Sequence, residues 1–101
     1  MPDTIRGRVL KIVDGGSFDV EVHYVGINNR RKYRPIERVR LANVDVPTLD
    51  TQAGLFRRST LAARLTGKEV RCFVHDRDVH EQIVATVTIV NTNHSELRAQ
   101  R

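Results

Sequence analysis

The sequence predicts a small antiparallel β-barrel of five strands, of the OB type, with one main α-helix packed against it. Three observations lead to this fold: strand-like patterns in three segments of the first half, a helical pattern at about residues 51–66, and two further strand-like segments after it. At 101 residues the chain can bury one modest core. We therefore expect residues 1–101 to form a single domain.

The first two strands are predicted on either side of a tight turn. Residues 5–13, IRGRVLKIV, are rich in β-branched side chains and end at the turn signal DGG. The next segment, SFDVEVHYV, alternates with a period of two, which is the clearest strand signal in the chain. Its apolar face carries Phe18, Val20, Val22 and Tyr24.

A polar connection and a third strand follow. Residues 26–35, GINNRRKYRP, are too many for a tight hairpin turn, so we expect this segment, hereafter the arm, to project from the barrel. The segment IERVRLANV predicts a strand with Val39 and Leu41 facing inward and with Arg38 and Arg40 on the opposite face. Pro47 ends its ladder of hydrogen bonds.

The second half predicts a helix, two strands and a short terminal helix. Leu61 and Leu65 lie four residues apart on a wide apolar helical face, and Gly67 is placed as the C-terminal cap. EVRCFVH and QIVATVTIV predict the last two strands, and Ser95 is placed as the cap of a short helix. The predicted core comprises Phe18, Val20, Val22, Val39, Leu41, Phe56, Leu61, Leu65, Val70, Val74, Ala85 and Val87.

The positive charge is concentrated in one segment. Between residues 30 and 40 the chain carries six basic residues and one acidic residue, a local charge of +5, which equals the formal charge of the whole chain. Arginine outnumbers lysine by 14 to 3. Guanidinium groups bind phosphate through two parallel hydrogen bonds, so this preference fits phosphate binding, although a genome-wide bias toward arginine codons explains it equally well.

The composition also bears on the compartment. The first residues contain no apolar run, and no apolar stretch approaches the ~20 residues of a membrane span, so we expect neither a secretory signal nor a membrane partner. The single cysteine, Cys72, excludes an intrachain disulfide and suits a reducing compartment. These features predict a cytoplasmic protein.

The arm is the segment most suggestive of a binding function. Its candidate nucleic-acid-binding residues are Arg30, Arg31, Lys32, Tyr33 and Arg34. Four of them are basic, and they flank the ring of Tyr33, on which a base can stack. The alternative is a loop whose charges only keep it solvated. Aromatic residues are few, so binding led by phosphate contacts, and therefore steeply dependent on salt, fits better than binding led by stacking.

Four motifs in order carry a resemblance to a known family. They are KIVDGGSFDV, VRLANVDVP, LAARLTGKEVRCFV and DRDVHEQIVATV, and together they resemble the staphylococcal nuclease-like (thermonuclease) family from about Ile5 to Ala99. The resemblance implies an OB-fold barrel and, in active members, a calcium-dependent phosphodiesterase that cuts DNA and RNA. Because such domains usually continue past the point where this chain stops, it also leaves open whether the chain is one module of a longer protein.

Carried over to this sequence, the family's site is partly present. Asp14 and Gly15 begin the turn, Arg40 matches the first phosphate-binding arginine, and Asp45 matches the second metal-binding aspartate. The resemblance thus makes Arg40 and Asp45 a vestigial phosphate site, and Asp45 with Asp14 the candidate ligands of Ca²⁺, a cation that takes oxygen ligands. An ion pair between Arg40 and Asp45 is an equally good interpretation.

The rest of the site is missing. Gly16 stands where the resemblance places a metal-binding aspartate, Thr48 where it places the glutamate beside the attacking water, and Gln82 where it places the second arginine. Losing such groups removes most of the stabilisation of the transition state. We therefore expect a catalytically degenerate, nuclease-like module that binds nucleic acid or another polyanion. The alternatives are a protein-interaction module and a residual calcium-dependent nuclease.

A zinc site at Cys72, His75 and His80 is a weaker hypothesis. Strand alternation places Cys72 and His75 on opposite faces of their strand, and the sequence offers no evident fourth ligand. We therefore expect these side chains to serve other purposes.

Overall fold

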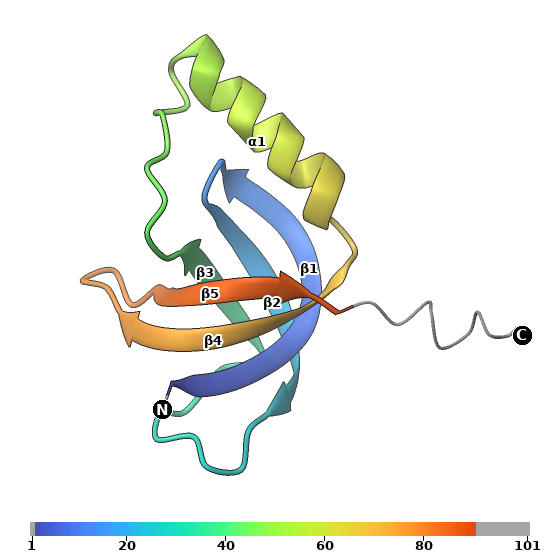
Figure 1. Cartoon of the computed structure of the whole chain (residues 1–101), viewed down its shortest axis with the longest axis vertical. Helices are drawn as coiled ribbons and strands as arrows, with labels where there is room; N and C mark the ends of the chain where they lie inside the picture. The colour runs from blue at the N-terminus through green and yellow to red at the C-terminus, as the bar shows by residue number, and fades with distance from the viewer. Residues whose placement is uncertain (1, 91–101) are drawn as a thin grey trace, which may run out of the picture.

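Five strands close into a barrel in the computed structural model, which describes residues 2–90, and one helix leans across one end of it (Figure 1). The predicted five-stranded barrel with one main helix is confirmed. The predicted terminal helix at Ser95 lies outside the described residues. The elements are β1 (Asp3–Asp14), β2 (Ser17–Val25), β3 (Ile36–Leu41), α1 (Gln52–Leu65), β4 (Glu69–Arg77) and β5 (Ile83–Ile89).

The strands follow the order β1-β2-β3-β5-β4 around the barrel, and β4 pairs again with β1. Four pairs are antiparallel, but β3 and β5 run parallel, with Val39 opposite Ile83 and Leu41 opposite Ala85. The expectation of an entirely antiparallel barrel is wrong for a simple reason. Strand direction cannot alternate all the way around a closed ring with an odd number of strands.

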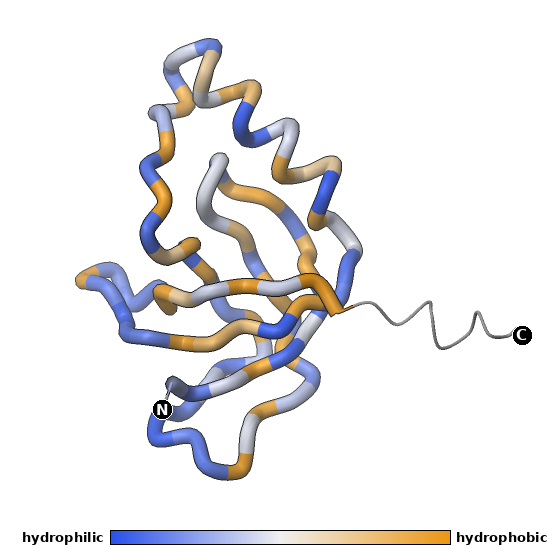
Figure 2. Tube along the Cα trace, viewed as in Figure 1, coloured by the Kyte–Doolittle hydropathy of each residue, from blue (hydrophilic) through white to orange (hydrophobic). Residues whose placement is uncertain are grey.

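Period-two alternation fills the barrel interior as expected, and Figure 2 shows hydrophobic and hydrophilic residues interleaved along the strands. Seven of the predicted core residues are buried, namely Phe18, Val20, Val39, Leu65, Val70, Val74 and Ala85. Four more, namely Val22, Leu41, Leu61 and Val87, are partly buried against that core. The core also contains Ile5, Val9, Ile12, Cys72 and Ile83.

The prediction for Phe56 is wrong, because its side chain is 71% exposed. The helix packs on β1, and Leu61, Ala62 and Leu65, near its C-terminal end, contact the core. The first turns of α1 extend beyond the barrel (Figure 1). The apolar face of the helix is therefore longer than the barrel surface on which it can pack, and Phe56 stays in solvent.

Both ends of α1 are capped. The Thr51 hydroxyl accepts a hydrogen bond from the backbone N–H of Gly54 at 3.0 Å. Thr66 is the C-terminal cap, with its backbone N–H donating to the carbonyl of Ala62, and Gly67 follows it with the expected positive φ, +78°. No helix within residues 2–90 has both the length and the apolar character that crossing a membrane requires.

Candidate functional site

Hydrogen bonds from β1 hold the first part of the arm against the barrel. The carboxylate of Asp3, a side chain only 4% exposed, accepts hydrogen bonds from the backbone N–H groups of Arg30 at 3.0 Å and Arg31 at 2.9 Å. It also accepts one from the hydroxyl of Tyr33 at 2.7 Å. The arm projects from the barrel as expected (Figure 1), but these hydrogen bonds fasten its first part to β1.

These contacts also set the ionisation of both groups. Burial by itself raises the pKa of Asp3, but the hydrogen bonds donated by Arg30, Tyr33 and Arg31 outweigh it, so the pKa is lowered from its ordinary value. Burial, together with the hydrogen bond to Asp3, raises the pKa of Tyr33. The carboxylate is thus the form that holds the arm in place.

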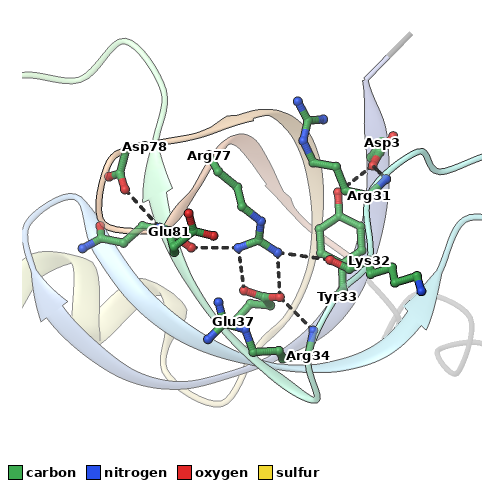
Figure 3. A network of polar contacts seen from close by, with 10 residues as sticks. Asp3, Arg31, Lys32, Tyr33, Arg34, Glu37, Arg77, Asp78 and Glu81 are labelled. Carbon is green, nitrogen blue, oxygen red and sulfur yellow. Dashed lines mark hydrogen bonds and ion pairs between the residues drawn. The ribbon is translucent and has the colours of Figure 1, made fainter.

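A buried ion pair fixes the other end of the arm (Figure 3). Glu37 is 2% exposed, and its carboxylate accepts hydrogen bonds from both terminal nitrogens of Arg77, at 3.1 and 2.9 Å. The backbone N–H of Arg34 donates to the same carboxylate at 2.8 Å. Bidentate, charge-assisted contact of this kind is the geometry that stabilises a buried carboxylate best, and the hydrogen bond to Glu37 raises the pKa of Arg77.

Arg77 joins three segments that are far apart in the sequence. Besides Glu37 on β3, its guanidinium donates to the backbone carbonyl of Lys32 in the arm at 3.2 Å and to that of Glu81 at 2.7 Å. Glu81 belongs to the loop between β4 and β5. The guanidinium also lies over the ring of Tyr33, 5.6 Å from its centroid. One arginine therefore positions the arm relative to the loop over residues 78–82.

Carboxylates neutralise the arm unevenly. Arg31 forms an ion pair with Asp76 at 3.6 Å, whereas Arg30, Lys32 and Arg34 form none within residues 2–90. The side chains of these three are exposed. Tyr33 is partly buried and anchored through its hydroxyl. The structure thus gives the arm a fixed backbone with three basic side chains in solvent.

Next to the arm, two hollows form one groove along β3. The first, of about 320 Å³, is lined by Arg34, Arg38 and His80 among others, and the second, of about 460 Å³, by Arg38, Arg40 and His80 among others. They share Arg38, His80 and Gln82 and are therefore continuous. The walls come from β3, from the loop over residues 78–82, and from the ends of β1 and β2 that flank the turn between them. In an OB-fold this face, flanked by these two loops, is the usual ligand-binding surface.

The basic residues of the groove are partly paired. Arg38 donates to both carboxylate oxygens of Asp19, at 2.8 and 3.2 Å. Arg40 pairs with Asp78, with 3.6 Å between Arg40 Nε and Asp78 Oδ2. The predicted ion pair between Arg40 and Asp45 is wrong, because the parallel pairing of β3 with β5 brings the loop that precedes β5 to Arg40. Asp45 is exposed and forms no ion pair within the described residues.

Asp78 has a second role in the same loop. Its other carboxylate oxygen accepts hydrogen bonds from the backbone N–H groups of His80 at 2.9 Å and Gln82 at 3.0 Å. The loop is therefore folded around the carboxylate that pairs with Arg40. Gln82, which replaces an arginine in the resemblance, lines the groove.

The residues at the expected calcium site do not fit a calcium ion. Asp14 Oδ1 accepts a hydrogen bond from the backbone N–H of Gly16 at 2.8 Å and so closes the turn. A Cβ atom on Gly16 would lie 2.5 Å from Cγ2 of Val46, so the space for a side chain there is filled. Within residues 2–90, no group of three or more acidic, histidine or cysteine side chains could hold a metal. Ca²⁺ takes about 6–8 oxygen ligands, and this turn does not gather them.

The remaining sequence-based candidates are separate from one another. Thr48 donates its hydroxyl hydrogen to Asp50 on the exposed loop before α1. His75 hydrogen-bonds Thr86 across the strands at 2.8 Å, and Cys72 is buried, with burial raising the pKa of its thiol to about 12. A zinc site that combines these residues is therefore not formed.

Four residues that organise the site were not predicted from the sequence, namely Asp3, Glu37, Arg77 and Asp78. A signal existed for Glu37, because it shares its strand face with Val39, which was predicted to point inward. A charge on an inward face requires a partner. The partner was hidden by a bulge between Val74 and Asp76, which changes the face on which Arg77 falls.

Comparison of the sequence with models of known protein families found no match, and comparison with curated proteins found none either. The likeness to thermonucleases therefore rests on the four motifs, while the barrel itself is established by the geometry described above.

Proposed function

We propose that this domain is a nuclease-like OB-fold module that binds a polyanion, with single-stranded nucleic acid as the ligand. The strand follows the arm past Lys32 and Arg34 and enters the groove at Arg38, His80 and Arg40. Binding depends mainly on phosphate contacts and is therefore weakly selective for sequence and steeply dependent on salt. The domain acts in the cytoplasm, which the presence of a single, buried cysteine suits.

One observation carries this proposal. The carboxylates that contact the arm bind its backbone N–H groups, which leaves the basic side chains of Arg30, Lys32 and Arg34 exposed. Asp3 and Glu37 accept hydrogen bonds from three backbone N–H groups of the arm, and Arg77 binds its Lys32 carbonyl. Fixing the backbone in the free protein lowers the entropy that binding would otherwise cost. Arg34 lines the groove directly, so the arm leads into it.

The groove contributes cations that keep some of their hydrogen-bonding capacity. Arg40 is half-exposed, and its contact with Asp78 at 3.6 Å is longer than a hydrogen bond, so its donors remain free for a phosphate oxygen. Arg38 uses two of its five donors on Asp19. Because carboxylates oppose both arginines, the unpaired charges on the arm supply most of the attraction.

Hydrolysis is not part of the proposal. A metal-dependent phosphodiesterase needs several oxygen ligands around its metal and a base beside the attacking water. Here Val46 occupies the space beside Gly16, and Thr48 replaces the carboxylate expected to direct water. The groove keeps arginines that can attract phosphate, while Gly16 and Thr48 stand at two of the positions that the resemblance assigns to catalysis.

The test compares two double variants with equal loss of charge. Lys32→Gln/Arg34→Gln removes two charges from the arm, and Arg64→Gln/Lys68→Gln removes two exposed charges near the C-terminal end of α1, away from the arm (Figure 1). All four side chains are exposed, so neither variant disturbs the fold. Affinity for a fluorescent single-stranded oligonucleotide is measured by anisotropy at several salt concentrations.

The arm variant should bind at least about tenfold more weakly, and its salt slope should fall by about two phosphate contacts. The α1 variant should stay within about twofold of the wild type. If both double variants lose affinity equally, binding depends only on the net charge of the protein, and the proposed role of the arm is wrong. Unchanged affinity in the arm variant would also refute the proposal.

A further inference from the structure

A third hollow lies beside the first part of the arm and shares no lining residue with the groove along β3. It has a volume of about 600 Å³, and its lining residues include three arginines and, within the described part of the chain, no acidic residue. The lining also contains the ring of Tyr24, which is 50% exposed, and Ile27, which is 91% exposed. The hollow therefore combines an aromatic ring with three guanidinium groups.

Strand register places these groups in a row. Arg6 on β1 lies directly opposite Tyr24 on β2 and, on its other side, directly opposite Arg71 on β4. The row therefore crosses three neighbouring strands on the outer face of the barrel, with the ring at one end and Arg71 at the other. Residues directly opposite in an antiparallel pair have Cβ atoms about 4.5–5.5 Å apart, so all three side chains can touch one small ligand.

The positive charge of the row is only weakly compensated by carboxylates of the described residues. Like charges directly across an antiparallel pair destabilise a sheet, and Arg6 and Arg71 are such a pair. Arg71 forms no ion pair within residues 2–90, while Arg6 reaches Glu69 only at 4.0 Å. The Nε atom of Arg6, which is the atom that lies 4.0 Å from Glu69, is buried and makes no hydrogen bond among the described residues. Unpaired donors of this kind call for a specific explanation.

Arg30, the third arginine of the hollow, lies on a loop that is hydrogen-bonded to β1. Asn29 accepts a hydrogen bond from the backbone N–H of Thr4 at 2.9 Å and donates one to the carbonyl of Thr4 at 2.8 Å. The Gly26 N–H donates to the same carbonyl at 2.9 Å, and Asp3 holds the next backbone N–H, that of Arg30. The wall that presents Arg30 and Ile27 is therefore fixed to β1 before any ligand arrives.

We propose that this hollow is a nucleotide-binding pocket, in which Arg6, Arg30 and Arg71 bind a phosphate group and Tyr24 stacks on the base. Guanidinium groups form paired hydrogen bonds with phosphate oxygens. In a nucleotide the base lies close to the phosphate, so Tyr24 can stack on the base while the neighbouring arginines bind the phosphate. The ligand is a free mononucleotide or the terminal nucleotide of a strand, since both present this chemistry. The pocket does not depend on the groove along β3.

The experiment titrates the protein with adenosine 5′-monophosphate, inorganic phosphate and adenosine, each followed by two-dimensional amide NMR. Arg71→Gln removes a charge from the pocket, and Arg8→Gln removes one from an exposed position two residues beyond Arg6 on β1, outside the pocket. Arg30→Gln is a second pocket variant at an exposed position, useful if Arg71→Gln alters the sheet. Thermal melts verify that each variant is folded.

The monophosphate should shift amides around residues 4–6, 24–30 and 71, and Arg71→Gln or Arg30→Gln should weaken its binding at least about tenfold, against about twofold or less for Arg8→Gln. Tyr24→Leu should weaken binding of the monophosphate but not of inorganic phosphate. Equal effects of Arg71→Gln and Arg8→Gln, or binding indifferent to Tyr24, would overturn the assignment.

A comparison of 5′-phosphorylated and 5′-hydroxyl trinucleotides separates the two sources. If the 5′-phosphorylated trinucleotide binds more tightly than the 5′-hydroxyl form, and Arg71→Gln abolishes this difference, the ligand is the end of a strand. If only the monophosphate binds, the ligand is a free nucleotide. The pocket is refuted when neither ligand depends on Arg71. Lys32→Gln/Arg34→Gln should leave binding of the monophosphate unchanged, so failure of this pocket is distinguishable from failure of the groove.

Discussion

Replacing Arg77 by methionine tests the buried ion pair that connects the arm to the barrel. The variant keeps an apolar side chain about as long as the methylene stem of arginine and removes the guanidinium, which leaves the Glu37 carboxylate, 2% exposed, without its charged partner. Backbone carbonyls of Lys32 and Glu81 lose their donors at the same time. Arg77 itself is largely buried, so water does little to offset these losses.

The expected cost follows from the burial of Glu37. Removing one partner of a buried pair destabilises a protein by about 3–5 kcal/mol, because the remaining charge is uncompensated. In a domain of about 100 residues, 1 kcal/mol corresponds to about 4–8 °C in Tm, so the melting temperature should fall by at least about 12 °C. Urea unfolding of the wild type and the variant measures the difference. Arg58→Met, at an exposed position on α1, is the control and should cost no more than about 0.5 kcal/mol.

The double variant Glu37→Leu/Arg77→Met distinguishes this explanation from a simple loss of packing. With the carboxylate also removed, stability should recover by at least about 2 kcal/mol relative to Arg77→Met, although the Arg34 N–H then lacks its acceptor. A cost for Arg77→Met no larger than that of the control would refute the reasoning. So would a double variant less stable than Arg77→Met.

Three further outcomes are expected. Gly16→Asp should lower the free energy of unfolding, measured in urea, by about 1–3 kcal/mol, because the added Cβ would lie 2.5 Å from Cγ2 of Val46. Adding Val46→Ala should restore part of this loss. Neither Gly16→Asp nor the double variant should bind Ca²⁺ in calorimetry. Asp3→Asn should cost about 1–3 kcal/mol near neutral pH. Because the pKa of Asp3 is lowered on folding, this gap should stay constant above about pH 5 and shrink as pH falls below 3.8; a gap that widens in acid would contradict the assignment. Gly67→Ala should lower stability by about 1 kcal/mol in thermal melts through its φ of +78° alone, since an added Cβ meets nothing within 4 Å, and Gly67→Asn should cost less.

The barrel could be predicted from the sequence because its signals are local. Alternation in β2 placed Phe18 and Val20 in the core, and Gly67 marked the end of the helix. Phe56 was misplaced because helical periodicity reveals which face is apolar but not how much of the helix finds a surface to cover it.

The site was less predictable because its contacts join distant segments. Asp3 binds a loop about 27 residues away, and Arg77 pairs with Glu37 across 40 residues. Arg40 faces Asp78 rather than the nearer Asp45 because of the parallel pairing of β3 with β5. Composition showed that charge gathers in residues 30–40, but only the fold shows which of these charges carboxylates neutralise.

Under the proposed function, the arm and the groove along β3 bind a nucleic-acid strand without metal. The decisive experiment is two-dimensional amide NMR of the ¹⁵N-labelled protein, titrated with a short single-stranded oligonucleotide in the presence of a chelator. We predict saturable shifts at residues 32–34, 38–40 and 80–82 that weaken as salt is raised. Shifts that are absent, that require added Ca²⁺, or that are confined to α1 would contradict it.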